Sequence, residues 1–266
     1  MTHAPLLVVG AGALGGALIE GWLASGAFAA GELIIVDPAP GPQARSAAAS
    51  GARLNPDAGA LADVRWVLLS VKPQAWRAVA ADIDPRLSKG AKIVSAAAGV
   101  AAADLAVAFA GRPVARAMPT LASAIGAGST ALWTADDALA AEVVELFAPL
   151  GAVVRLPNEA MLHAATAASG SGPAYLYAFI EALEAAAVAA GLPPEEGARV
   201  IRATICGAAA LLAKGEATPA ELRARVTSEG GTTAAALKVL AGEGGLAPLM
   251  ERAVAAAAAR SRELGR

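Results

Sequence analysis

The chain has 266 residues, of which 56% are hydrophobic and 17% are charged, with a formal net charge of −2. This composition is typical of a globular protein and excludes a disordered chain, and the near-neutral charge argues against a nucleic-acid-binding surface. The single cysteine, Cys206, excludes an intrachain disulfide and a zinc cluster, so no bound metal is expected and Cys206 is interpreted as a small core residue. The segment from Met1 to Pro5 leaves no room for a signal peptide, and no stretch is long and uniform enough for a transmembrane helix, which favours a cytoplasmic protein.

The first structural signal is a short apolar strand, Leu6 to Val9, followed by a glycine-rich turn and an apolar helix. Gly10, Gly12 and Gly15 have the spacing G-x-G-x-x-G. The first glycine permits a tight turn, the second lets the backbone approach a pyrophosphate, and the third lets the helix pack close to the strand. The helix N-terminus then faces the phosphates. The pattern predicts a dinucleotide-binding loop formed by Gly10, Ala11, Gly12, Ala13, Leu14 and Gly15.

A second apolar run, residues 33–36, ends in Asp37, roughly 20 residues beyond the last glycine of the loop, where a ribose-binding carboxylate is expected. Such a carboxylate suits the ribose 2′-hydroxyl of NAD and repels the 2′-phosphate of NADP. Asp57 adds to that repulsion, whereas Arg45 offers a phosphate contact. We predict that NADH serves at least as well as NADPH.

Short apolar strands alternate with helices as far as Pro157. Further strands are expected near residues 52–54, 66–71, 92–95, 113–117, 126–133 and 152–156, with helices near 43–50, 57–63, 74–82, 101–109 and 137–150. This alternation is typical of an α/β domain whose parallel sheet is covered on both faces. We therefore assign residues 1–157 to a dinucleotide-binding domain.

Beyond Asn158 the sequence shows only helical patterns, separated by glycine and proline. Helices are expected near residues 159–168, 172–190, 194–213, 218–225, 232–241 and 245–263. Residues 158–266 are accordingly assigned to an all-α domain. Its surface is rich in alanine and weakly charged, which predicts a homodimer formed through these helices.

Dinucleotides bind at the carboxyl ends of parallel strands, so the loops at those ends are candidate cofactor contacts. Small or unusual residues stand in three of them, namely Val71, Lys72 and Pro73, then Ala97, Ala98 and Gly99, and then Met118 and Pro119. Each loop alone is equally typical of an ordinary strand-to-helix turn. Together with the glycine loop they favour a bound cofactor.

Two segments of the helical part contain more glycine and hydroxyl residues than helices need, and these run from Ser169 to Tyr175 and from Thr227 to Thr233. Consecutive N–H groups and hydroxyls at the start of a helix are suited to binding a carboxylate. A helix–helix turn with threonine caps explains the same residues. Both interpretations stay open on the residues alone.

With these segments the chain resembles the pyrroline-5-carboxylate reductase family. The matching pieces are Val71 to Gln74, Ser95 to Val100, Arg116 to Pro119, Ser169 to Tyr175, and Thr227 to Thr233, within a resemblance that extends from Leu6 to Leu264. The resemblance implies a Rossmann-type domain, a helical dimerisation domain and NAD(P)H-dependent reduction of a cyclic imine to L-proline. It also implies that the helical domains of two subunits interlock, that the partner's helices contribute to the active site, and that dimers form larger rings.

For such a reaction we assign roles to individual residues. The Thr233 hydroxyl is expected to face the ring nitrogen of the substrate, with Ser228 supporting the same loop. The N–H groups of Gly230, Gly231 and Thr232 are expected to hold the substrate carboxylate. Glu216 is a candidate near the substrate nitrogen, or a solvated cap, and Asp57 is placed near the adenosine of NAD or NADP.

The chain departs from the family pattern in two segments. Thr120, Leu121 and Ala122 follow Met-Pro where the family has Asn-Thr-Pro, and Glu229 stands where the family has proline. His163 lacks a partner pattern and is interpreted as structural. The alternative functions are another NAD(P)-dependent imine reductase, a non-catalytic nucleotide-sensing module, or a 3-hydroxyacid-type dehydrogenase, which would need an acid/base such as Lys214 or Lys238.

Overall fold

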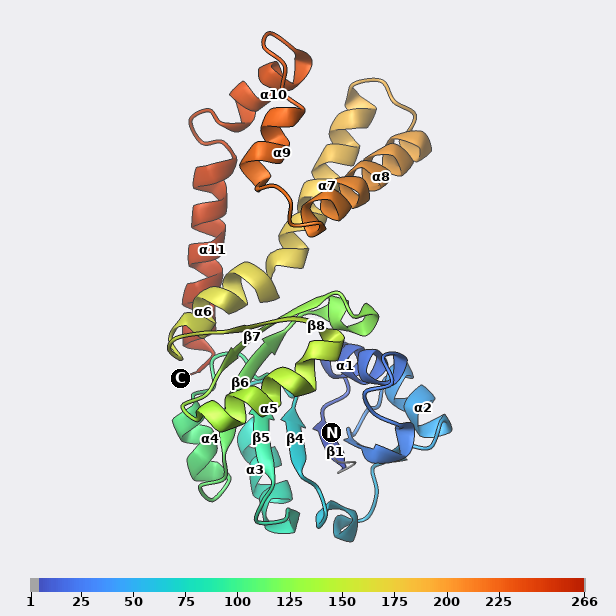
Figure 1. Cartoon of the computed structure of the whole chain (residues 1–266), viewed down its shortest axis with the longest axis vertical. Helices are drawn as coiled ribbons and strands as arrows, with labels where there is room; N and C mark the ends of the chain where they lie inside the picture. The colour runs from blue at the N-terminus through green and yellow to red at the C-terminus, as the bar shows by residue number, and fades with distance from the viewer. Residues whose placement is uncertain (1–4, 266) are drawn as a thin grey trace. The chain divides into compact units, whose positions relative to one another are not determined.

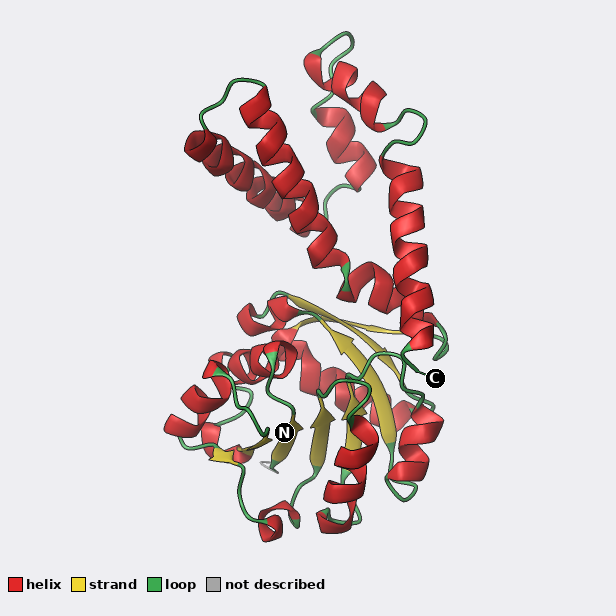
Figure 2. Ribbon diagram, turned by 180° about the vertical axis from the view of Figure 1, so that it is seen from behind, coloured by secondary structure: helices red, strands yellow, loops and turns green. Residues whose placement is uncertain are grey.

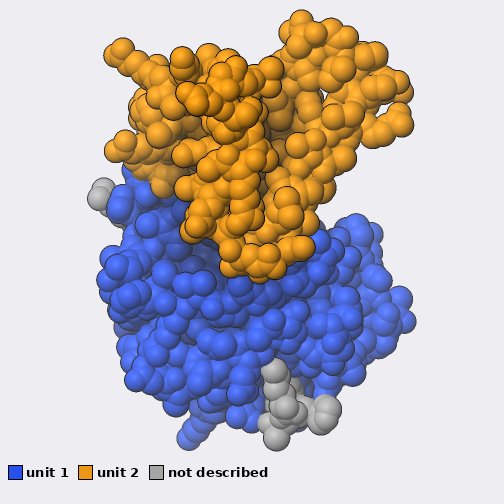
Figure 3. Space-filling model, turned by 45° about the horizontal axis from the view of Figure 1, so that its top comes forward, with its two compact units in different colours: residues 1–170, 256–266 blue, residues 171–255 orange. Residues whose placement is uncertain are grey.

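The computed structural model describes residues 5–265. The chain forms two compact units, Met1–Gly170 with Ala256–Arg266, and Ser171–Ala255 (Figure 3). The division therefore follows Gly170, whereas the sequence placed it after Pro157, and the end of the chain returns to the first unit. The physical reason is packing, because Leu162 is buried with Met118 of the sheet. We call these the nucleotide unit and the helical unit.

The nucleotide unit is built around one eight-stranded sheet with the order β3-β2-β1-β4-β5-β6-β7-β8 (Figure 1). The strands are β1 (Leu6–Val9), β2 (Leu33–Val36), β3 (Arg53–Leu54), β4 (Trp66–Leu69), β5 (Lys92–Ser95), β6 (Val114–Pro119), β7 (Gly128–Trp133) and β8 (Gly151–Arg155). The order reverses between β1 and β4, and in open α/β sheets ligands bind in the crevice beside such a reversal. The carboxyl ends of β1 and β4 are therefore the expected centre of the site.

One strand differs from the prediction of a parallel sheet. The pairs from β3 to β6 are all parallel, but β7 is antiparallel to β6. A parallel connection needs a crossover of a dozen or more residues. Only the short 3-10 helix η4 (Leu121–Ile125) and a turn lie between β6 and β7, so the chain reverses direction there. The pair β7–β8 is parallel again, because helix α5 connects those strands.

Helices cover both faces of the sheet (Figure 2). Those of the nucleotide unit are α1 (Ala13–Ala24), α2 (Pro42–Ala49), α3 (Trp76–Ile83), α4 (Ala102–Ala108), α5 (Asp137–Phe147) and α6 (Met161–Ala165), which continues as the π-helix Thr166–Gly170.

Alternate residues of β1 enter two different cores, because successive side chains of a strand point to opposite faces. Leu6 and Val8 join one buried cluster, and Leu7 and Val9 join the other. The helix expected near residues 57–63 is only the short 3-10 helix Ala58–Leu61.

Trp22 ties α1 to α5 in the larger core. It is fully buried, its indole Nε1 donates to the Leu146 carbonyl oxygen at 2.8 Å, and its ring meets Phe28 and Phe147 edge-on. Buried tryptophans need such a partner for the N–H group. Helix α1, which follows the glycine loop, is thus held against the rest of the nucleotide unit.

The helical unit contains α7 (Gly172–Ala189), α8 (Pro194–Ala213), α9 (Pro219–Arg225) and α10 (Thr232–Leu240), and α11 (Leu246–Glu263) leads from it back to the nucleotide unit. Within residues 171–255, all of which are described, only Gly197 and Ile201 are buried. Cys206 is exposed in the single chain, contrary to the prediction of a core position. Within residues 5–265, no helix has both the length and the apolar character needed to cross a bilayer.

Candidate functional site

The loops at the carboxyl ends of the parallel strands are joined to one another by backbone hydrogen bonds. Gly10 N–H donates to the Val36 carbonyl oxygen, Ser70 N–H to Val9, and Ala96 N–H to Leu69, at 2.9, 2.8 and 2.8 Å. These bonds continue the pairing of β2, β1, β4 and β5 by one residue beyond each strand. The predicted cofactor loops therefore share one edge of the sheet and start from a common, fixed backbone.

The glycine loop has the geometry that its spacing predicts. Gly10 has a φ of +89°, and a Cβ there would lie 2.4 Å from the Ser70 carbonyl oxygen. A Cβ on Gly15 would lie 2.0 Å from the Gly10 carbonyl oxygen, so α1 can approach β1 only because this residue is glycine. Around Gly12, by contrast, no atom lies within 4 Å of a built Cβ. A backbone exposed in this way at a helix N-terminus fits a pyrophosphate.

Asp37 follows β2 and is part of a hydrogen-bonded corner. Its two carboxylate oxygens accept from Ala11 N–H at 2.6 Å and from Ala39 N–H at 2.7 Å. Asn55, which has a φ of 47°, bonds the backbone N–H and carbonyl of Asp37 through its side-chain amide. The carboxylate is thus held beside the glycine loop, and each oxygen keeps a lone pair for a ribose hydroxyl.

Asn55 was missed by the sequence reasoning, which chose Asp57 instead. Asp57 is exposed, and its side chain makes no capping bond at the 3-10 helix that follows it. A left-handed asparagine beyond an apolar strand is a recognisable signal, because asparagine tolerates this backbone conformation and bonds nearby backbone groups. Val71 packs near Gly10, whereas Lys72 is exposed.

The loop between β5 and α4 contains Ala97, Ala98 and Gly99. Ser95 Oγ accepts from Ala97 N–H at 3.3 Å. Gly99 has a φ of +82°, and a Cβ there would lie 2.6 Å from both the Ser261 carbonyl oxygen and the Gly265 nitrogen. The glycine is therefore required by the returning end of the chain, a reason that the sequence did not reveal.

The end of β6 carries Met118 and Pro119, both buried. The next residue, Thr120, accepts from Ser129 N–H through its hydroxyl oxygen at 3.0 Å. Ser129 Oγ lies 2.8 Å from Ser169 Oγ, which belongs to the π-helix that leads to the helical unit. Thr120 thus closes the turn between β6 and β7, and Ser169 is joined to that turn.

In the helical unit, the segment Thr227–Thr233 forms a tight turn and the start of α10. Gly230 has a φ of +69°, and Gly231 N–H donates to the Ser228 carbonyl oxygen at 3.1 Å. That bond uses the Gly231 N–H group within the turn of the single chain, and its contact to a substrate carboxylate stays a prediction. The N–H groups in the first turn of α10, at Thr232 and Thr233, have no intrahelical acceptor.

Comparison with known proteins identifies the family. Family models described as pyrroline-5-carboxylate reductase dimerisation and as NADP oxidoreductase, coenzyme F420-dependent, match residues 159–264 and 6–99. A pyrroline-5-carboxylate reductase of Pseudomonas aeruginosa is 38% identical over 270 residues, which cover 99% of this chain and 98% of that protein. The chain belongs to the pyrroline-5-carboxylate reductase family. The resemblance inferred from the motifs is thereby confirmed.

Solved structures of this family have the same fold. A pyrroline-5-carboxylate reductase from Coxiella burnetii matches with a TM-score of 0.88 and 29% identity, and the match covers 100% of both chains. A pyrroline carboxylate reductase from Plasmodium falciparum, solved with NADP bound, matches with a TM-score of 0.86 and 24% identity over 100% of both chains. The predicted fold class, a Rossmann-type domain followed by an all-α dimerisation domain, is confirmed. The match of the helical part to the dimerisation model supports a homodimer.

The two departures from the family pattern occupy different surroundings. Thr120 is buried at the end of β6, where its hydroxyl oxygen serves the turn described above. Glu229 is exposed, as are Ser228 and Glu216. In the single chain the Glu229 carboxylate therefore keeps its contact with water and is not buried beside the start of α10.

His163 lies on α6 of the nucleotide unit. Its Nδ1 lies 3.0 Å from Ser261 Oγ. Burial, and then the positive charges of Arg116 and Arg262, hold the pKa of His163 below its ordinary value of 6.5, while Glu159 opposes the shift. The lowered pKa favours the neutral imidazole near pH 7, and the contact to Ser261 agrees with the structural interpretation.

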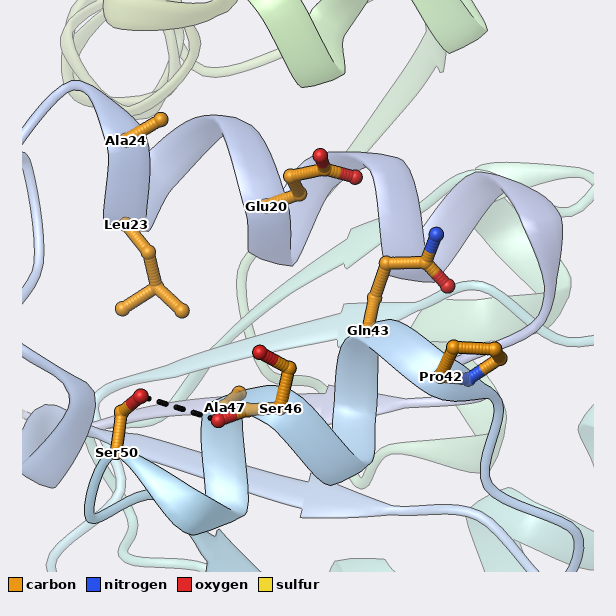
Figure 4. A pocket seen from close by; sticks show the side chains of 8 residues that line it. All are labelled: Glu20, Leu23, Ala24, Pro42, Gln43, Ser46, Ala47 and Ser50. Atoms are coloured by element: carbon orange, nitrogen blue, oxygen red, sulfur yellow. Dashed lines mark hydrogen bonds between the residues drawn. The ribbon is translucent and has the colours of Figure 1, made fainter.

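A cavity of about 530 Å³ lies between α1 and α2 (Figure 4). Glu20 and Leu23 of α1 and Gln43 and Ser46 of α2 are among the side chains that line it, and the Ser50 hydroxyl donates to the Ser46 carbonyl oxygen beside it. None of the predicted cofactor residues lines this cavity. The nucleotide site is consequently assigned to the open edge of the sheet.

Proposed function

We propose that this protein reduces the C=N bond of 1-pyrroline-5-carboxylate with NADH or NADPH, giving L-proline. The observation that carries the proposal is the family-specific segment Gly230–Thr233 in a chain that also has a complete glycine loop. Similarity to curated pyrroline-5-carboxylate reductases along almost the whole chain supports it. The substrate name comes from those relatives and is part of the proposal.

The nucleotide unit binds the cofactor in this proposal. Gly12 and the N–H groups at the start of α1 approach the pyrophosphate, and Asp37 accepts from the adenosine ribose. The small residues of the β5–α4 loop and Met118 at the end of β6 border the nicotinamide end. The remaining predicted contacts are Gly10, Ala11, Ala13, Leu14, Gly15, Val71, Lys72, Pro73 and Pro119, together with Asp57 near the adenosine.

The helical unit binds the substrate. The N–H groups of Thr232 and Thr233, at the positive end of α10, hold the substrate carboxylate, and Gly230 provides the turn that exposes them. The Thr233 hydroxyl faces the ring nitrogen. Ser228 supports the turn, because its carbonyl oxygen accepts from Gly231 N–H, and Glu216 remains a candidate near the nitrogen.

When bound at the residues named above, the reduced nicotinamide would supply a hydride to the imine carbon, and the C=N π electrons would move to nitrogen. The reaction is fastest on the protonated iminium, whose proton stays on nitrogen in the product. The imine is basic enough to take that proton from water near neutral pH, so the protein needs no strong acid. Its task is to align the two reactants and to neutralise the carboxylate.

The assembly is part of the same proposal. The family resemblance implies an active site that includes the partner's helices and rings of dimers, and the nearly coreless helical unit supports an obligate dimer. The cytoplasmic location expected from the sequence also belongs to the proposal.

The deciding experiment measures steady-state oxidation of NADH and NADPH with 1-pyrroline-5-carboxylate and without a substrate, and, separately, reduction of NAD⁺ by 3-hydroxyacids. We expect turnover with the imine alone. Turnover with a 3-hydroxyacid and NAD⁺ would favour the dehydrogenase alternative, for which Lys214 and Lys238, both exposed, are the only lysines of the helical unit. Tight nucleotide binding with no turnover would favour a sensing module.

A further inference from the structure

Glu159 connects two loops of the nucleotide unit that are far from it in sequence. Its Oε1 accepts from Ala102 N–H at 2.7 Å and from Arg116 Nη1 at 2.9 Å. Ala102 is the first residue of α4, which follows the β5–α4 loop, and Arg116 lies on β6 just before Met118. One carboxylate oxygen therefore joins the two segments that are proposed to border the nicotinamide end of the cofactor.

The contact to α4 replaces a missing local cap. The residue before α4 is Ala101, whose side chain cannot accept a hydrogen bond. The first N–H groups of a helix need an acceptor from outside the helix. Glu159 provides it from a position 57 residues further along the chain. Without it, the end of the β5–α4 loop loses its charged anchor, whereas the start of the loop keeps the Ser95 bond and the burial of Ala97.

The contact to β6 joins the partly exposed Glu159 carboxylate to a buried arginine. Arg116 is 4% exposed, and its Nε has no hydrogen-bond partner among the described residues. The guanidinium therefore depends on Glu159 for its ion pair. Removing one partner of a buried ion pair leaves an uncompensated charge, which the surrounding structure relieves by moving. Arg116 pairs with Ser95 across β5 and β6, so such a movement reaches the start of the same loop.

We infer that Glu159 is a positioning residue for nucleotide binding, acting through the β5–α4 loop and the end of β6. It touches neither cofactor nor substrate in this inference. The inference rests on the proposed function only in requiring that these loops border a nicotinamide nucleotide. Its specific content is that loss of Glu159 weakens nucleotide binding by more than the loss of a comparable ion pair elsewhere in the unit.

Asp84 and Arg112 offer a matched control. Asp84 Oδ1 accepts from Arg112 Nε at 2.7 Å, and the arginine is again mostly buried, at 10% exposure. This pair lies in the same unit, but its other bonds are to the Asp84, Leu87 and Ser88 carbonyl oxygens rather than to a predicted cofactor loop. Glu159→Gln and Asp84→Asn each remove one negative charge from a buried pair without changing the shape of the side chain.

The test measures the Kd of NADPH and of NADH by nicotinamide fluorescence, without imine, for wild type, Glu159→Ala, Glu159→Gln and Asp84→Asn. We expect Glu159→Ala to raise the Kd about 10-fold, because a charge-assisted bond and loop position are both lost, and Glu159→Gln to raise it less. In turnover, KM for the nucleotide should rise more than kcat falls. Asp84→Asn should lower Tm but keep the Kd within about twofold.

A second readout needs no nucleotide. Amide hydrogen exchange over residues 96–105 should become faster in the Glu159 variants and stay at the wild-type rate in Asp84→Asn. Equal Kd changes in all variants, or unchanged Kd and exchange in the Glu159 variants, would overturn the inference. If Glu159→Ala does not fold, Glu159→Gln decides by the same criteria. A wild-type protein that binds nucleotide but does not reduce the imine contradicts the proposed function alone.

Discussion

The two units differ in how they bury their apolar residues. In the nucleotide unit, side chains from both faces of the sheet and from α1 to α5 form two continuous cores. In the helical unit, α7 buries no residue, and Leu176, Tyr177 and Phe179 are exposed in the single chain. A leucine or phenylalanine left in water forgoes about 1.5–3 kcal/mol of stabilisation. The nucleotide unit is thus complete as one chain, whereas the helical unit is completed by a second copy.

The most direct test of this difference is to introduce a charged residue on the exposed apolar surface of the helical unit. Leu212 is 46% exposed and lines an apolar cavity of about 610 Å³ between α7, α8 and α9. Leu212→Glu should give a monomer in light scattering, with activity below about one hundredth of wild type, because a carboxylate cannot be buried in the dimer. Val107→Glu, at an 84% exposed position of α4, should leave both properties unchanged. A stable, active wild-type monomer at micromolar concentration would contradict the dimer.

Substrate chemistry is assigned to the helical unit and nucleotide binding to the nucleotide unit. The variant Thr233→Val tests these two assignments separately. The variant keeps the shape of the side chain and removes the hydroxyl. We expect a loss in kcat/KM of roughly 10- to 1000-fold with unchanged nucleotide Kd, because a preorganised polar contact to the reacting group is lost. If Thr233 only stabilises the helix start, Tm falls by a few degrees and kcat/KM stays within about twofold.

The glycine loop allows packing and binding to be tested apart within the nucleotide unit. Gly15→Ala places a Cβ 2.0 Å from the Gly10 carbonyl oxygen. It should lower Tm by about 5 °C or more and weaken nucleotide binding about 100-fold. Gly12→Ala meets open space, so it should keep Tm within about 2 °C and still weaken binding at least about 10-fold, since the methyl group displaces the pyrophosphate. Normal nucleotide binding by Gly12→Ala would exclude this loop as the phosphate site.

Cofactor preference is a smaller effect set by one corner of the nucleotide unit. Asp37 is anchored by Ala11 and Ala39, and its charge opposes a 2′-phosphate, so kcat/KM with NADH should equal or exceed that with NADPH. Asp37→Ser should shift the ratio toward NADPH by about 10-fold. Arg45 Nε donates to the Pro40 carbonyl oxygen, so its guanidinium lies at the same loop. A wild-type preference of about 10-fold for NADPH would show that this arginine outweighs the carboxylate.

The smallest predicted effect is a pH dependence of stability through His163. Its pKa in the folded protein lies below 6.5, so the unfolded chain binds the proton first as the pH falls. The stabilisation is complete above about pH 6.5 and decreases as the pH approaches the lower folded-state pKa. Between about pH 7 and pH 5.5, Tm of wild type should fall by about 1–2 °C more than Tm of His163→Gln. Equal slopes for the two proteins would contradict this assignment.

Local patterns predicted the elements and the loops well, because strand and helix periods and glycine spacing are properties of neighbouring residues. The strands, α7, α8 and α10 lie close to their expected bounds, and the geometry of Gly10 and Gly15 agrees with the spacing. Contacts between distant segments left no such pattern. Glu159 with Arg116, and Gly99 with the end of the chain, join residues whose own neighbourhoods are unremarkable, and the bond of Asn55 to Asp37 joins residues 18 positions apart.

The antiparallel β7 and the extent of the units were missed for the same reason. The sequence between β6 and β7 contains helix-compatible residues, but too few to cross the sheet. The helical segment after Pro157 starts against the sheet rather than in the second unit. The Gly231 N–H bond was missed because a tight turn and an open anion-binding loop use the same residue types.

The packing of Gly99 against Ser261 and Gly265 has a consequence for the order in which the protein folds during synthesis. The ribosome releases residues 5–170 before residues 256–265, with the whole of the helical unit between them. The nascent nucleotide unit therefore leaves the tunnel with its Gly99 surface uncovered. Translation of the helical unit must finish before the end of the chain can cover that surface. A polypeptide stopped within residues 171–255 therefore exposes its β5–α4 loop to chaperones and proteases.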